Sequence, residues 1–210
     1  MIMNSYRVRV GLVCTAAVVI GACSSFRDNL LEPQQPGVIG PDATQSATAA
    51  DALRKGAVSR LRTATVGGEA VWMLGGLMAD EWKTGDTFSQ RNETDQRIVQ
   101  TNNANVAGMY VALQRTRGAA YDAIGALKAF IPDTTSKQAQ MYWVLGGAEL
   151  ALAENFCSGV PYGTLVDGVP TYTNPLTTAQ GFTLAMKHLD SALALATGSD
   201  TSSNVLFGNL

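Results

Sequence analysis

The sequence is poor in the side chains on which most metal sites and nucleophilic active sites depend. Its 210 residues include one His and three Cys, too few for a usual zinc site or a disulfide framework. The single histidine, His188, stands beside Lys187 and away from the apolar stripe of a predicted helix, so we expect a solvated surface side chain. No Ser-His-Asp or Cys-His arrangement is recognisable around it. These shortages disfavour several common catalytic mechanisms, and we expect neither a cofactor nor turnover.

Charge is also scarce. Charged residues make up 15% of the chain, against about 25% in an average soluble domain. The 15 Lys and Arg are outnumbered by 17 Asp and Glu, so no basic excess is present to neutralise phosphates. We therefore expect no nucleic-acid partner. Hydrophobic residues make up 46%, which is ample for a packed core.

The remaining chemical motifs are weak. Asp80 and Glu81 are adjacent acids, but neighbouring helical side chains point about 100° apart and do not face each other as an acid–base pair. Gly67-Gly68 and Gly75-Gly76 match neither a P-loop nor a dinucleotide motif. We expect Gly75-Gly76 to mark a close contact between helices, and Cys157 to be a small buried residue.

The N-terminus predicts a lipid anchor. Arg7 and Arg9 precede an uncharged segment, Val10 to Ala22, which is shorter than the roughly 20 residues that span a bilayer. Residues 1–22 are therefore interpreted as a signal peptide. Ile20-Gly21-Ala22-Cys23 is typical of a bacterial lipobox, which predicts acylation of Cys23. Several acyl chains, at about 0.8 kcal/mol per buried CH₂, give a stable anchor. An ordinary secretory signal followed by a chance cysteine is the alternative.

Residues 23–43 are predicted to be the lipid anchor and an extended tether. The segment contains Pro33, Pro36, Pro41 and two glycines, which disfavour a helix. No Asp follows Cys23 directly, which by analogy with known sorting rules favours the outer membrane.

From Thr44 the sequence predicts helices. Apolar residues three or four apart begin there, and Gly67-Gly68 ends the first helix. Further helices are expected at about 69–82, 104–130, 137–156 and 178–196. The last begins with a capping box formed by Thr177 and Gln180. Inward positions expected in the first, second and last helices include Ala47, Leu61, Leu74, Met78, Phe182, Ala185, Ala192 and Leu193.

Two segments are predicted to be irregular. Residues 83–102 are polar and form a long loop, and loops of this length are often functional. Residues 157–174 are irregular, with a small hairpin around Asp167-Gly168. The helix starts near 104 and 137 lie close to a 34-residue tetratricopeptide (TPR) period. The predicted fold of residues 44–210 is thus all-α, a TPR-like antiparallel helix array with long irregular loops. Apolar residues continue to Leu210, and we expect a truncated chain, a frayed natural C-terminus being the alternative.

Aromatic residues are the candidates for ligand contact. Flat rings stack on the apolar faces of sugars while amides and carboxylates bind the hydroxyls. Trp82 adjoins the long polar loop, and Tyr162 and Tyr172 lie in the irregular 157–174 segment. Tyr110 and Trp143 lie on helical faces and are expected in the core. Plain packing is the alternative for all three loop aromatics.

Several stretches, in order, resemble the SusD/RagB family of nutrient-uptake lipoproteins. They are Cys23 with Pro36-Gly37-Val38-Ile39, Asp80-Glu81, Arg91, Thr94-Asp95-Gln96-Arg97, Tyr110, Leu113, Ala153-Glu154-Asn155-Phe156-Cys157-Ser158-Gly159-Val160-Pro161-Tyr162, Pro175-Leu176-Thr177-Thr178 and Leu189-Asp190-Ser191-Ala192-Leu193. The resemblance implies an all-α, TPR-like scaffold, of which this chain is the N-terminal part. It also implies a lipid-anchored protein of the outer membrane, at the cell surface. Such a protein captures oligosaccharides or peptides for a partner TonB-dependent (SusC-like) outer-membrane transporter.

Two other functions stay open at this point. A periplasm-facing helical-repeat scaffold lipoprotein would share the lipobox and the helices. It would give no reason for the Phe156-to-Pro161 segment. A lipid-anchored hydrolase would need convergent polar groups that the sequence does not reveal.

Overall fold

The computed structural model describes residues 45–157, 159–166 and 169–196. The predicted signal peptide 1–22, the lipidated Cys23, the tether 23–43 and the end of the chain after residue 196 lie outside the described residues. The Asp167-Gly168 turn also lies outside them.

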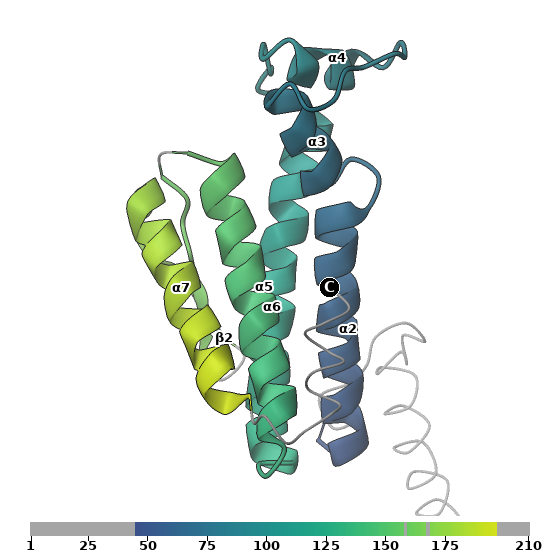
Figure 1. Cartoon of the computed structure of the whole chain (residues 1–210). Coiled ribbons are helices and arrows are strands. Elements are labelled where there is room, and N and C mark those ends of the chain that lie inside the picture. The colour runs from purple at the N-terminus through teal and green to yellow at the C-terminus, as the bar shows by residue number, and fades with distance from the viewer. Residues whose placement is uncertain (1–44, 158, 167–168, 197–210) are drawn as a thin grey trace, which may run out of the picture. The chain divides into compact units, whose positions relative to one another are not determined.

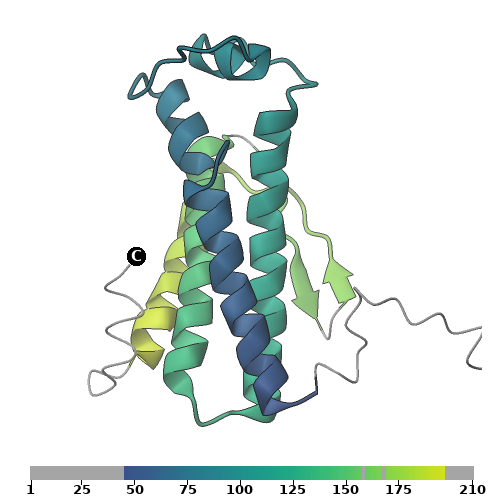
Figure 2. The same ribbon diagram turned by 90° about the vertical axis from the view of Figure 1, so that its right-hand side faces the viewer.

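The described part is all-α apart from one hairpin. Four long helices lie side by side, and two short helices lie toward one end of them (Figures 1 and 2). The helices are α2 (Ala47–Val66), α3 (Val71–Met78), α4 (Ser89–Asp95), α5 (Ala104–Phe130), α6 (Thr135–Asn155) and α7 (Thr178–Leu195). Strands β1 (Thr164–Val166) and β2 (Val169–Thr171) pair antiparallel, with Thr164 opposite Thr171. The predicted hairpin is thus confirmed, and it lies beside α5 (Figure 2).

Helix α6 is the centre of the bundle. It packs against α2, α5 and α7, and its buried side chains therefore face several directions. The fully buried members include Met141, Val144, Leu145, Ala148 and Leu152. The predicted stripe of α5 packs against this core through Leu113, Ala120, Ile124 and Leu127.

Capping residues set the helix ends that matter for the site. The Asn103 side chain accepts hydrogen bonds from the N–H groups of Asn105 and Val106, which starts α5. Thr177 and Gln180 form the predicted capping box at the start of α7. Each cap satisfies N–H groups that the first helical turn leaves without partners.

The second helix is shorter than predicted. It covers Val71–Met78 rather than 69–82 because Glu69 and Asp80 adopt left-handed backbone conformations, with φ of 57° and 62°. The predicted loop 83–102 is also partly wrong, since it contains α4.

The buried residues of α7 are small. They are Gly181, Ala185 and Ala192, whereas Phe182 and Leu193, both predicted inward, are exposed. Helices α6 and α7 approach closely at Gly146, where an added Cβ would lie 2.8 Å from Leu189 Cγ. Ala47 and Met78 were also predicted inward and are exposed.

The glycine pair of α3 fits the expected close contact in part. A Cβ on Gly75 would lie 2.9 Å from Asn155 Oδ1 at the end of α6, so this glycine does permit a helix–helix approach. Gly76 instead lies against the indole of Trp82, which follows α3 in the chain. None of the helices within the described ranges is both long enough and apolar enough to cross a membrane.

Candidate functional site

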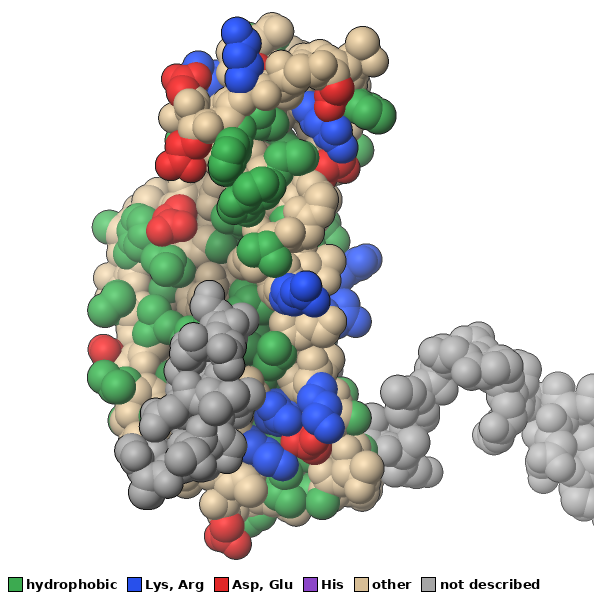
Figure 3. Space-filling model, turned by 45° about the vertical axis from the view of Figure 1, so that its right-hand side comes forward, with side chains coloured by type: hydrophobic (Ala, Val, Ile, Leu, Met, Phe, Trp, Pro, Cys, Tyr) green, Lys and Arg blue, Asp and Glu red, His purple; other side chains and the backbone are tan. Residues whose placement is uncertain are grey.

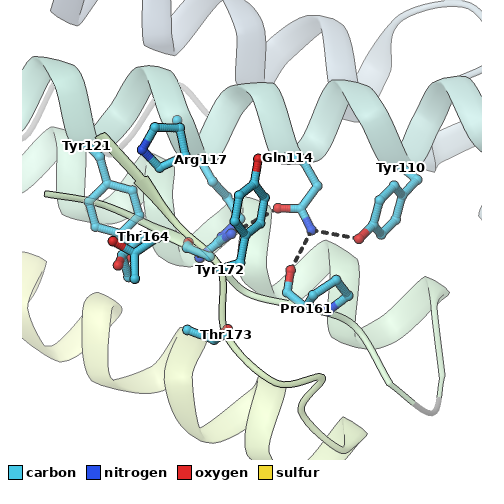
Figure 4. Close-up of a pocket in the computed structure, with 12 residues that line it drawn as sticks. Tyr110, Gln114, Arg117, Tyr121, Pro161, Thr164, Tyr172 and Thr173 are labelled. Carbon is cyan, nitrogen blue, oxygen red and sulfur yellow. Dashed lines mark hydrogen bonds between the residues drawn. The ribbon is translucent and has the colours of Figure 1, made fainter. Parts of the chain in front are cut away.

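A pocket of about 350 Å³ lies between α5 and the segment 161–173 (Figure 4). Its α5 wall is mainly one stripe, because Tyr110, Gln114, Arg117 and Tyr121 follow one another at intervals of three or four and share one helix face. The opposite wall comes from the hairpin and the residues beside it. The lining residues are Tyr110, Gln114, Arg117, Gly118, Tyr121, Pro161, Gly163, Thr164, Pro170, Thr171, Tyr172 and Thr173.

Gln114 connects the two walls of the pocket. Its Nε2 donates to the Tyr110 hydroxyl at 3.0 Å and to the carbonyl of Pro161 at 3.1 Å. Its Oε1 accepts from Arg117 Nη1 at 2.9 Å. The side-chain amide is therefore held in one orientation (Figure 4). Since the Tyr110 oxygen is the acceptor in this contact, its own hydroxyl hydrogen remains available to a ligand.

A buried ionic network supports the pocket from behind. Arg117 is 3% exposed, and its Nε and Nη2 donate to Oε1 of the fully buried Glu149 at 3.1 and 3.0 Å. Nη2 also donates to the carbonyl of Gly163 at 2.9 Å, which holds the irregular segment against α5. A buried charge is tolerated only when it is paired and hydrogen-bonded, and here both charges are.

His188 belongs to this network, so the prediction of a solvated surface histidine is wrong. Its Nδ1 lies 2.6 Å from Glu149 Oε2, and its side chain is 13% exposed. The ring also stacks on Tyr142, with centroids 6.2 Å apart. Glu149 gave a clue in the sequence, because an acid within the apolar stretch of α6 needs buried partners.

Tyr162, predicted to contact ligand, is a core residue. It is 3% exposed and is not part of the pocket lining. Arg117 Cζ lies 5.1 Å from the centroid of its ring, which adds a cation–π contact to the network. Burial raises the pKa of Tyr162 to about 12, so the phenol stays protonated. The residue belongs to the core and does not line the pocket.

Trp82 also lies away from the pocket. Its ring packs on Trp72, with centroids 4.9 Å apart, and its Nε1 donates to the Trp72 carbonyl at 3.1 Å. Both rings are exposed in part, and hydrophobic side chains gather on the surface toward that end of the molecule (Figure 3). Cys157, predicted to be buried, is an exposed free thiol.

Tyr172 is the one predicted ligand-contacting aromatic that lines the pocket. Its side chain is 91% exposed, which leaves its ring free to contact a ligand. Sequence reasoning missed Tyr121 as a lining residue and placed Tyr110 in the core, although Tyr110 is half-buried and reaches the pocket. The spacing of Tyr110, Gln114, Arg117 and Tyr121 on α5 was the available clue.

The pocket is suited to binding. Tyrosine rings offer flat apolar faces, and the threonine and tyrosine hydroxyls offer hydrogen bonds. Arg117 is the charged residue of the lining, and its guanidinium group is paired with the carboxylate of Glu149. Across the ranges 45–157, 159–166 and 169–196, no three His, Cys, Asp or Glu side chains are placed to hold a metal ion.

Comparison of the chain with protein-family models, curated proteins and solved structures finds no match.

Proposed function

We propose that this protein captures oligosaccharides at the bacterial cell surface and delivers them to a TonB-dependent outer-membrane transporter. The observation that carries the proposal is the tyrosine-lined pocket, in which Tyr110, Tyr121 and Tyr172 share one cavity. Sugars have apolar ring faces and hydroxyl edges, and this wall offers both kinds of contact. A volume of about 350 Å³ is at the lower end of small-ligand sites, which suits one end of an oligomer.

The pocket walls are organised before any ligand arrives. Arg117 and Gln114 bind the carbonyls of Gly163 and Pro161, so the irregular segment is fixed against α5. Preorganisation of this kind lowers the entropy cost of binding. Walls fixed in this way suit the capture of a ligand without turnover.

The cellular part of the proposal rests on the N-terminal sequence and on the family resemblance. Lipidation at Cys23 would hold the protein at the outer membrane, facing outward. A TPR-like arrangement of the helices belongs to the same proposal, and the antiparallel pair α5 and α6 is compatible with it. Cys23→Ser should abolish incorporation of a labelled fatty acid; equal labelling of wild type and variant would remove the anchor from the proposal.

Glycan arrays probed with the full chain test the capture itself, with Tyr172→Ala and Trp82→Ala compared on every glycan that binds. Loss of one aromatic contact costs roughly 0.5–1.5 kcal/mol, so Tyr172→Ala should weaken binding. Trp82→Ala should leave affinity unchanged, because Trp82 packs on Trp72 outside the pocket. Absence of binding to any glycan, or shortening of a bound glycan by the protein, would overturn the proposal.

A periplasm-facing scaffold is a second candidate, and one observation favours it. Phe182, Met186 and Leu193 leave large apolar surface exposed on α7, as an internal helix of a longer array would before its neighbour packs on it. Proteolysis of intact cells separates the two functions. Cleavage supports the surface receptor, and protection supports the scaffold.

A further inference from the structure

A second hollow, of about 420 Å³, lies between α2 and α5. It is lined by Arg60 from α2 and by Arg115, Gly118, Ala119 and Asp122 from α5. Two arginines and one aspartate therefore line the same space. This composition differs from that of the tyrosine pocket, whose one charged lining residue, Arg117, is paired with the buried Glu149.

The two hollows meet at Gly118. This residue lines both of them, because the stripe through Arg115, Gly118 and Asp122 runs next to the tyrosine stripe on the same helix. Gly118 carries no side chain, so no side chain separates the two hollows at this position. A ligand longer than one sugar ring could therefore contact both hollows.

The arginines of the second hollow differ from most others in the described part of the chain. Arg54, Arg91, Arg97 and Arg117 each form a salt bridge. Arg60 and Arg115 are exposed and form none with any residue that the structure describes. Asp122 is the single acid of the hollow, and burial raises the pKa of its carboxyl group. With two cations and one acid, the hollow favours an anion.

We propose that the ligand is an acidic oligosaccharide, with a sugar ring in the tyrosine pocket and a carboxylate bound by Arg60 and Arg115. This inference rests on the proposed function and names its substrate class. Guanidinium groups match the planar geometry of a carboxylate, to which they donate paired hydrogen bonds. The carboxyl group of Asp122 accepts hydrogen bonds from sugar hydroxyls.

The test compares two probes that differ only in charge: an oligogalacturonide and the same oligomer with its carboxyl groups methyl-esterified. Calorimetry on the full chain should show about fivefold tighter binding of the acid form, the scale of one or two exposed ion pairs. The preference should shrink in about 1 M salt, which screens exposed charges. The double variant Arg60→Gln/Arg115→Gln should bind both probes equally. Arg62→Gln is the matched control, since Arg62 is exposed on the same helix but does not line the hollow.

The outcomes separate this inference from the proposed function. Equal affinity of the wild type for both probes, or equal loss of the preference in Arg62→Gln, overturns the acidic-ligand inference. If Tyr172→Ala still weakens binding of both probes in that case, the tyrosine pocket remains the binding site. Failure of both probes to bind, while neutral glycans bind on the array, also overturns only the acidic-ligand inference. Absence of binding to every glycan overturns both.

Discussion

Nδ1 of His188 lies 2.6 Å from Oε2 of Glu149, a carboxylate with no exposed surface. The other oxygen of Glu149 accepts two hydrogen bonds from Arg117. One buried acid on α6 therefore connects α5 with α7, and through Arg117 it also connects them with the carbonyl of Gly163. The core of the bundle and the wall of the pocket depend on the same network.

Arg117→Met should destabilise the fold by about 3–5 kcal/mol, because it leaves the carboxylate of Glu149 buried without its main partner. The double variant Arg117→Met/Glu149→Met should lose less, since it removes both charges. Urea unfolding followed by circular dichroism measures both free energies. A single variant within about 1 kcal/mol of wild type would contradict the interpretation of the network as a stability determinant.

A charged cluster at the start of α2 makes stability dependent on pH. Asp51 accepts from Arg54, Lys55 and Lys137, each at 2.9 Å, and basic side chains gather around an acidic one at that end of the molecule (Figure 3). These partners, Arg54 foremost, lower the pKa of Asp51 well below its ordinary value. The folded state then binds fewer protons than the unfolded state. The contribution of Asp51 to stability is therefore present above about pH 4 and lost as the pH falls through the lower folded-state pKa.

Asp51→Asn should accordingly flatten the acid side of the stability profile. Between about pH 4 and pH 2, the free energy of unfolding of the wild type should fall more steeply than that of the variant. Urea titrations at fixed pH values provide the comparison. Asp133→Asn serves as the control, because Asp133 is exposed and forms no ion pair with the described residues. Parallel profiles for the wild type and Asp51→Asn would refute the expectation.

The sequence predicted helices with long apolar stripes well and side-chain partners poorly. The range of α5, Ala104–Phe130, matches the prediction. Apolar residues recur at helical spacing along all 27 residues, and Asn103 and Pro132 on either side leave few other positions for the helix ends. No sequence pattern indicated that Glu69 and Asp80, which limit α3, adopt left-handed backbone conformations. The placement of His188 failed for another reason: its partner Glu149 is 39 residues away, and only packing of α7 on α6 brings the two together. Tyr162 and Tyr172 were equivalent in sequence, and only the tertiary fold buries one and exposes the other.

The spacing between α6 and α7 depends on Gly146. A Cβ at this position would lie 2.8 Å from Leu189 Cγ and 3.1 Å from the carbonyl oxygen of Ala185. Gly146→Ala should therefore lose about 1–3 kcal/mol through overpacking. Gly125→Ala on α5 is the matched control, since a Cβ there meets nothing within 4 Å, and it should gain up to about 1 kcal/mol from helix propensity. Thermal melts of the two variants should move in opposite directions; a stabilised Gly146→Ala would show that the helices separate at little cost.

The last prediction concerns the wall of the pocket. Gln114 supplies a hydrogen bond to the carbonyl of Pro161, and Gln114→Ala removes that donor together with the contacts to Tyr110 and Arg117. Arg117 still binds the carbonyl of Gly163, so the segment should loosen without detaching. A net loss of about 1 kcal/mol per hydrogen bond corresponds to roughly fivefold faster amide exchange, confined to residues 159–174 while the exchange of α6 stays unchanged. Hydrogen–deuterium exchange read by mass spectrometry resolves the two regions, with Gln96→Ala as the control because Gln96 is exposed outside the pocket. Uniformly faster exchange across α6 as well would show that Gln114 stabilises the whole bundle, and unchanged exchange would show that Arg117 alone holds the wall.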